Sequence, residues 1–187
     1  LVDHLMDLRA PLDDQLRGTD RQEVRHLVRK ARALGVVARP ARDERDFERF
    51  YHDVLEPFLR ARHGAQAIVD RCATVAARLR RPDYEFVELV LHQEVVGGIV
   101  LRFVGHECLS LEVGLRTDLV PAVARLLPTQ AFLAAIDRGL ARGCSTLRFG
   151  GSLAFSSDPV FRAKRRWGAR TVPRDKLTHP EWSWLAR

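Results

Sequence analysis

Residues 147–169 read LRFGGSLAFSSDPVFRAKRRWGA, and this stretch carries the clearest change of local pattern in the chain. Apolar residues predict a strand over 146–149, and two consecutive glycines open a loop directly after it. Ser157-Asp158-Pro159 is typical of a helix start, because serine or aspartate caps free N–H groups and proline fits the first turn. Gly168 ends the predicted helix. The stretch is therefore predicted to be a strand, a loop and a helix.

A meander of three strands precedes this stretch, because apolar residues recur at every second position over 84–92, 95–104 and 108–115. Only the short turns Gln93-Glu94 and Gly105-His106 separate these segments. Turns of this length join antiparallel neighbours, so we predict an antiparallel meander at the centre of a sheet.

Helices and short strands surround the predicted meander. Apolar residues at helical spacing predict helices at about 20–34, 43–62, 67–80 and 130–142, with a kink at Pro57 and with Thr129 as an N-cap. Short strands are predicted at 36–39 and 170–172, a loop at 116–128, and a short helix or the remnant of a linker at 1–18. The predicted fold class is α/β (α+β), a mixed sheet with a central antiparallel meander and flanking helices. We divide the chain into an N-terminal extension or linker at 1–19 and a single domain at 20–187.

The composition is that of a globular protein with a basic surface, at a formal net charge of +7. Only three of the 31 basic residues are lysine, namely Lys30, Lys164 and Lys176. A basic surface favours anionic partners such as CoA, tRNA or lipid headgroups, although a GC-rich genome produces the same arginine bias without any binding role. The cysteines and histidines show no metal-ligand spacing, and no apolar run reaches the length of a membrane span. We therefore expect no metal, no transmembrane segment and a cytoplasmic location.

The order of elements from residue 36 onward resembles that of the GNAT superfamily of acyltransferases. Within 147–169, the residues that resemble the Fem-like branch of this superfamily are Phe149-Gly150, Ser152, Lys164 and Trp167-Gly168. The segments VRHLVRKARALG (24–35) and FYHDVLEPFLRARHG (50–64) are also similar to that branch, and VVGGIVLRF (95–103) resembles the third strand of the superfamily. The resemblance covers about 20–172 and implies a GNAT-type mixed sheet.

The resemblance also implies a function, namely an N-acyl or aminoacyl transferase. Such an enzyme moves an acyl group from acyl-CoA or aminoacyl-tRNA, used as a co-substrate, to the amine of a small molecule or glycan. The Fem-like branch points to bacteria and to envelope or polysaccharide biosynthesis, and its members often pair two such domains. A permanently bound cofactor is not expected, and tRNA is a candidate partner.

Amine acylation requires a held carbonyl group, a donor for the developing oxyanion and a route for the amine proton. The resemblance places Lys164 opposite the reacting carbonyl, where its ammonium stabilises negative charge. Glu112 lies on the strand that lines the acyl cleft of GNAT proteins, so its carboxylate is the predicted proton acceptor. The predicted binding residues are Arg116 and Arg125, for phosphate, and Gly150 and Ser152, for a ligand at the end of a strand. Each of these residues can also be an ordinary surface or loop residue.

Two other functions remain open. The first is a degenerate GNAT domain that only binds, because Gly151 and Ala163 replace an arginine and an aromatic residue of the Fem-like pattern. The loop at 116–129 also lacks the glycines with which GNAT proteins hold pyrophosphate. The second is a nucleic-acid-binding module that uses a stripe of arginines on the first long helix, at positions 21, 25, 29 and 32.

Overall fold

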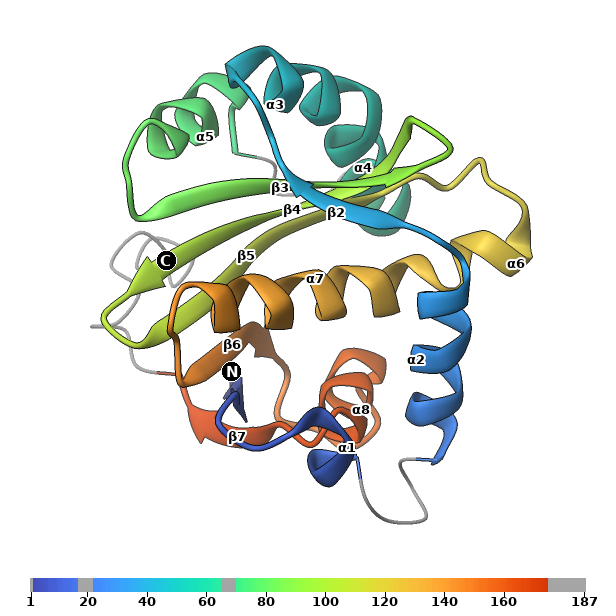
Figure 1. The fold of residues 1–187 in the computed structure, drawn as a ribbon, viewed down its shortest axis with the longest axis vertical. Helices are drawn as coiled ribbons and strands as arrows, with labels where there is room; N and C mark the ends of the chain where they lie inside the picture. Colours follow the sequence, from blue (N-terminus) through green and yellow to red (C-terminus); the bar gives the residue numbers. More distant parts are fainter. Residues whose placement is uncertain (1, 17–21, 65–69, 175–187) are drawn as a thin grey trace.

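The computed structural model describes residues 2–16, 22–64 and 70–174 of the chain (Figure 1). The strands are β1 (Val2–Asp7), β2 (Val37–Pro40), β3 (Tyr84–Leu91), β4 (Glu94–Val104), β5 (Glu107–Leu115), β6 (Thr146–Ser152) and β7 (Arg170–Pro173). The helices are α1 (Leu12–Gln15), α2 (Gln22–Ala33), α3 (Glu44–Phe50), the π-helix η2 (Tyr51–Leu55), α4 (Glu56–His63), α5 (Cys72–Leu79), α6 (Pro121–Ala124), α7 (Leu127–Ala141) and α8 (Pro159–Arg166). The strands form one seven-stranded mixed sheet in the order β2-β3-β4-β5-β6-β1-β7.

Helices cover both faces of this sheet. In Figure 1, α3, α4 and α5 lie on one side of the meander and α7 lies on the other. The strand period explains the two layers, because neighbouring residues of a strand point to opposite faces. Phe86 and Val100 pack with the residues of α3, η2 and α5, whereas their neighbours Val87 and Ile99 pack with the residues of α7. The predicted fold class, with its antiparallel meander and flanking helices, is therefore confirmed.

The sheet opens between β5 and β6. These strands are parallel and pair only over Glu107–Leu109 and Thr146–Arg148, although both continue beyond that point. On its other side, β5 pairs with β4 and carries a bulge, because Val100 faces Glu112 while the next residue, Leu101, faces Ser110. A bulge redirects the side chains beside it and increases the local twist. The separation of β5 from β6 and the bulge together locate the candidate site.

The helix over 44–63 contains a π-turn in its middle. Pro57 has no N–H to donate to the carbonyl four residues earlier, and η2 immediately precedes α4, in which Pro57 occupies the first turn. Gly114 of β5 lets this turn lie directly on the sheet, because a Cβ atom at Gly114 would be 2.8 Å from the Cα atom of Leu55. The glycine therefore sets the close approach of η2 to β5.

Several sequence-based predictions differ from the structure. A short helix or linker remnant was expected for the first residues, but Val2–Asp7 form β1, between β6 and β7. The loop predicted after residue 149 is wrong, because 150–152 continue β6 through pairing with β1. Thr129 is not an N-cap, because α7 starts earlier and Thr129 is buried inside it. The predicted loop at 116–128 contains α6, and the expected helix at 67–80 begins at Cys72, with 65–69 outside the described residues. The single domain at 20–187 stays a prediction.

Candidate active site

The end of β6 provides two backbone carbonyl groups to a buried lysine. Gly150 adopts a φ of 75°, a left-handed conformation that residues with a Cβ atom rarely adopt. The ammonium group of Lys164 donates hydrogen bonds to the carbonyl oxygens of Gly150, at 3.0 Å, and Gly151, at 2.9 Å. Only 7% of Lys164 is exposed. The lysine and the glycine predicted from the sequence therefore lie together.

Helix α8 holds Lys164 in this position. Asp158 caps the helix by accepting hydrogen bonds from the N–H groups of Val160, at 2.6 Å, and Phe161, at 3.1 Å. Trp167, at the other end, is buried and packs edge-on against Phe132 of α7. An aspartate cap at one end and an aromatic anchor at the other fix the helix, so the lysine points inward.

Burial lowers the pKa of Lys164 from 10.5 to about 8. The positive charges of Arg174 and Arg62 lower it further, while Asp3 and Asp158 oppose the shift. Because this pKa remains above 7, the ammonium form prevails at neutral pH. The group can therefore donate hydrogen bonds to a developing negative charge, and it loses its proton more readily than an exposed lysine.

A buried histidine holds Ser152, at the end of β6. The His4 Nε2 atom lies 2.8 Å from the Ser152 hydroxyl oxygen, and that hydroxyl donates to the Leu153 carbonyl at 3.0 Å. Burial, followed by the charge of Lys164, lowers the pKa of His4 to about 4, so the ring is neutral at pH 7. The Ser152 hydroxyl already donates to a carbonyl, so His4 Nε2–H is the donor to its oxygen. Sequence reasoning missed His4, because nothing near it in the chain marks it.

Glu112 lies beside the bulge of β5. It is directly opposite Val100, so its side chain lies on the face that α3, η2 and α5 cover. Burial raises the pKa of Glu112 to about 7, and the negative charge of Asp70 adds to the shift against the opposing charge of Arg78. Asp70 itself pairs with Arg78 at 2.6 Å. A carboxyl group with this pKa can accept a proton near neutral pH.

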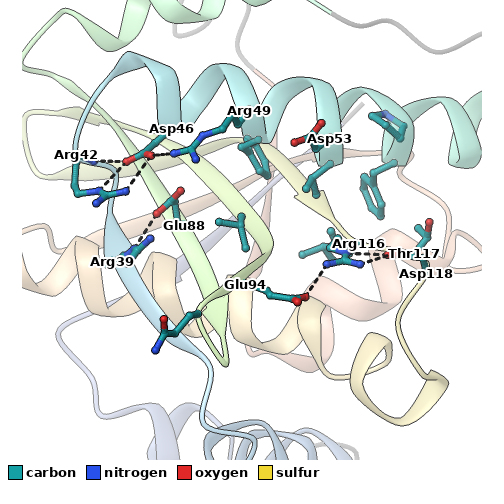
Figure 2. A pocket seen from close by; sticks show the side chains of 17 residues that line it. Arg39, Arg42, Asp46, Arg49, Asp53, Glu88, Glu94, Arg116, Thr117 and Asp118 are labelled. Atoms are coloured by element: carbon teal, nitrogen blue, oxygen red, sulfur yellow. Dashed lines mark hydrogen bonds and ion pairs between the residues drawn. The ribbon is translucent and has the colours of Figure 1, made fainter.

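A groove of about 710 Å³ lies beneath α3, η2 and α4 at the turn end of the meander (Figure 2). Arg116 lines it and forms ion pairs with Asp118, at 2.6 Å, and with Glu94, at 3.1 Å. The hydrogen bond from Arg116 to Asp118 raises the pKa of Arg116 above its usual value. Arg116 is thus engaged by carboxylates, which weakens the predicted phosphate contact.

The predicted site residues lie in four places. Gly150, Ser152 and Lys164 lie together at the end of β6, and Glu112 lies on the neighbouring strand β5. Arg116 lines the groove, whereas Arg125 is exposed at the end of α6 and does not line it.

The arginine stripe of α2 is only partly available to a partner. Arg25 donates to the carbonyl of Asp13 at 2.9 Å, whereas Arg29 and Arg32 are exposed. Arg21 lies outside the described residues. Within the ranges given above, no three histidine, cysteine or acidic side chains gather as metal ligands do. Over the same ranges, every helix is too short or too polar to cross a bilayer.

Comparison with known proteins shows the fold. No protein-family model and no curated protein sequence matches the chain. Among solved structures, FemX superposes with a TM-score of 0.72 at 13% identity over 100% of this chain and 64% of FemX. The C-terminal domain of a protein assigned as a lysylphosphatidylglycerol synthetase, from Agrobacterium fabrum, gives 0.62 at 12% identity over 92% of this chain and 58% of its own. An aminoglycoside acetyltransferase from an uncultured soil sample gives 0.50 at 10% identity over 70% of this chain and 86% of its own.

These structures are GNAT-type acyltransferase folds, and the chain has the same fold. The resemblance inferred from residues 147–169 is therefore confirmed at the level of the fold. The chain spans less than two thirds of the length of FemX and of the synthetase structure.

Proposed function

We propose that this GNAT-type domain transfers an acyl or aminoacyl group to an amine. The observation that carries the proposal is the buried ammonium of Lys164, held at the end of β6 where that strand separates from β5. The names of the similar structures support it, since they describe an aminoglycoside acetyltransferase and a lysylphosphatidylglycerol synthetase. FemX has the highest TM-score of the three, which supports the proposed similarity to the Fem-like branch.

In the proposed reaction, the amine nitrogen attacks the carbonyl carbon of a thioester or an aminoacyl ester directly. A C–N bond forms, the C–S or C–O bond breaks, and Lys164 stabilises the oxyanion between these steps. Glu112, in its ionised form, accepts the amine proton directly or through water, and the leaving thiolate or ribose oxygen takes a proton from solvent. Lys164 and Glu112 are the proposed catalytic residues.

The proposed donor is acyl-CoA or aminoacyl-tRNA, and both present phosphate groups to a basic protein. Arg125, which is exposed, is better placed for a phosphate than Arg116, which two carboxylates already engage. Gly150 and Ser152 are the proposed contacts at the end of β6. The acceptor is the amine of a small molecule or glycan, and the Fem-like resemblance favours envelope or polysaccharide biosynthesis in a bacterial cytoplasm.

One observation favours a second candidate, a domain that binds such ligands without catalysis. Both hydrogen bonds of the Lys164 ammonium end on carbonyl groups of the protein itself, so only one of its three N–H donors is left for a substrate oxyanion. The ion pairs of Arg116 also favour the binding domain, because they leave its guanidinium less available to the phosphate of a donor.

The test is an acyl-transfer assay with acetyl-CoA, longer acyl-CoAs and aminoacyl-tRNA as donors, and an aminoglycoside, an amino sugar and a short peptide as acceptors. We expect turnover with one donor class, lost in Lys164→Met and retained in Lys30→Met, a matched control on the exposed part of α2. Thermal melting with each donor is measured in parallel, since a ligand that binds the native state raises the melting temperature. A melting shift without turnover supports the binding domain and contradicts the enzyme.

A further inference from the structure

One end of the groove in Figure 2 presents positive charge outward. Asp46 and Glu88 are 2% exposed there, whereas Arg42 is 71% and Arg49 is 67% exposed. Arg42 and Arg49 share the single carboxylate of Asp46, and Arg39 donates to Glu88 at 2.8 Å. Three guanidinium groups therefore face two buried carboxylates. The surplus cation and the outward position of the guanidinium groups suit an anionic group of a ligand.

The other end of the groove has the reverse arrangement. Arg116 is 29% exposed, whereas its partners Glu94 and Asp118 are 70% and 65% exposed. Asp53, an exposed residue of η2, also lines the groove and has no ion-pair or hydrogen-bond partner within the described part of the chain (Figure 2). Two exposed carboxylates therefore pair with one guanidinium at this end, and Asp53 adds a third carboxylate to the lining, so this end suits a cationic group.

Apolar side chains separate the two charged ends. Phe50 and Val54, from α3 and η2, and Leu115, from β5, line the groove between them. Asp46 and Asp53 are seven residues apart on one continuous helix, a rise of about 10 Å. An extended peptide spans about 3.3–3.6 Å per residue, so roughly three residues bridge the two ends. The volume of about 710 Å³ falls within the range of small-ligand sites.

We propose that this groove binds a short zwitterionic peptide of about three residues. The carboxylate of the peptide lies at Arg42 and Arg49, and its ammonium group lies at Asp53, Glu94 and Asp118. The π-turn strengthens the assignment, because such turns occur frequently at functional sites and this one carries Asp53. The site is separate from Lys164 and does not depend on the proposed transferase activity, because binding alone tests it.

The experiment measures binding of triglycine to the full chain by isothermal titration calorimetry at low ionic strength. N-acetyltriglycine lacks the ammonium group, triglycine amide lacks the carboxylate, and glycine is too short to reach both ends. We expect triglycine to bind and each of the other three probes to bind at least about tenfold more weakly, the scale of one charge-assisted hydrogen bond.

Single substitutions assign the two ends. Asp53→Asn and Arg49→Gln are each expected to weaken triglycine binding about tenfold, and Arg80→Gln is the matched control. Arg80 forms an exposed ion pair with Glu44 and does not line the groove. Unchanged melting temperatures without ligand show that the variants fold. Equal affinity for triglycine and its two capped forms, or no binding of triglycine at millimolar concentration, overturns the proposal.

Discussion

The ammonium group of Lys164 donates a hydrogen bond to the carbonyl oxygen of Gly150 at 3.0 Å, which links α8 to the strand that precedes it. Its second bond, to Gly151, also ends on a neutral carbonyl oxygen. Burial therefore acts on a charge that these two bonds compensate only in part, and the pKa of Lys164 falls to about 8.

Substitution Lys164→Met should change how stability depends on pH. The native pKa of about 8 lies below the ordinary lysine value of 10.5, so the unfolded chain binds more protons between these pH values. Stability of the wild type should therefore rise from pH 8 to 10.5 relative to Lys164→Met, by up to about 1.4 kcal/mol per pH unit. Urea unfolding at several pH values measures this difference. A flat difference contradicts it, and Lys30→Met should behave as the wild type.

Glu112→Gln should remove the rising limb of the pH–activity profile. The pKa of Glu112 is raised to about 7, so the fraction in the ionised, proton-accepting form increases as pH rises through that value. In the wild type, kcat/KM should increase through about pH 7, and Glu112→Gln should lower it by about 10²–10⁴. Glu48→Gln, at an exposed position of α3, is the control. If Glu112→Gln keeps the same profile, another group is the base.

The same substitution makes a prediction about stability without any substrate. A native pKa above the unfolded value of 4.5 means that ionisation of Glu112 costs the folded state, so stability is lost as pH rises from 4.5 through about 7. Glu112→Gln should lack this loss. Denaturant unfolding from about pH 4 to about pH 8, a range that includes both pKa values, compares the two proteins. An identical pH dependence in both proteins is incompatible with the buried position of this carboxyl group.

Ser152→Ala should destabilise the protein by about 1–3 kcal/mol, because it leaves the buried Nε2 group of His4 without its partner. Ser145→Ala is the control, since the Ser145 hydroxyl is 3.5 Å from its acceptor and should contribute little. Chemical denaturation gives both values. Equal stability of the two variants excludes a structural role for the His4–Ser152 bond.

Asp3→Ala should cost more than about 1 kcal/mol, because it removes the fully buried carboxylate 3.0 Å from the guanidinium of Arg148, which keeps Glu107, also at 3.0 Å, as a partner. The matched change at an exposed pair, Glu44→Ala, removes the partner of Arg80 and should cost less than about 1 kcal/mol. The difference between the two unfolding free energies is the measured quantity. Similar losses in both variants contradict a dominant role for the buried pair.

The sequence predicts those parts of the fold in which partners are close along the chain. The meander is one of them, because short turns join β3, β4 and β5 and the two-residue period orients each strand. Strand β1 could not be predicted in this way. Asp3 and His4 interrupt its apolar pattern, yet both are fully buried because each has a polar partner. These partners are distant in the sequence, since Arg148 lies 145 residues from Asp3 and Ser152 lies 148 residues from His4.

In the candidate site, too, the features that could be predicted depend on residues close in the chain, and the others depend on distant ones. Lys164 was predicted as a site residue because the residues around it resemble a known motif, and Glu112 because the resemblance places its strand along the acyl cleft; both roles stay predictions. The only hint in the sequence of the ion pair between Arg116 and Asp118 is their spacing of two residues. The ion pair between Arg116 and Glu94 forms because β5 runs back alongside β4 in the meander. The separation of positive and negative charge in the groove could not be predicted from neighbouring residues in the sequence. The residues that line the groove come from α3, η2, β2 and the turn of the meander, which are distant in the chain.

The position of β1 also bears on synthesis at the ribosome. Val2 pairs with Ser152 and with Pro173, so β1 finds both of its neighbours only when the last described elements have emerged. At about 5–20 residues per second, the ribosome needs roughly 10–30 s to make the intervening chain. During that time the backbone N–H and C=O groups of residues 2–7 lack their strand partners, and we expect the polar Asp3, His4 and Asp7 to oppose pairing with a neighbouring nascent chain. We therefore expect Asp3 and His4, which bind Arg148 and Ser152 in the folded protein, to oppose aggregation of the nascent chain.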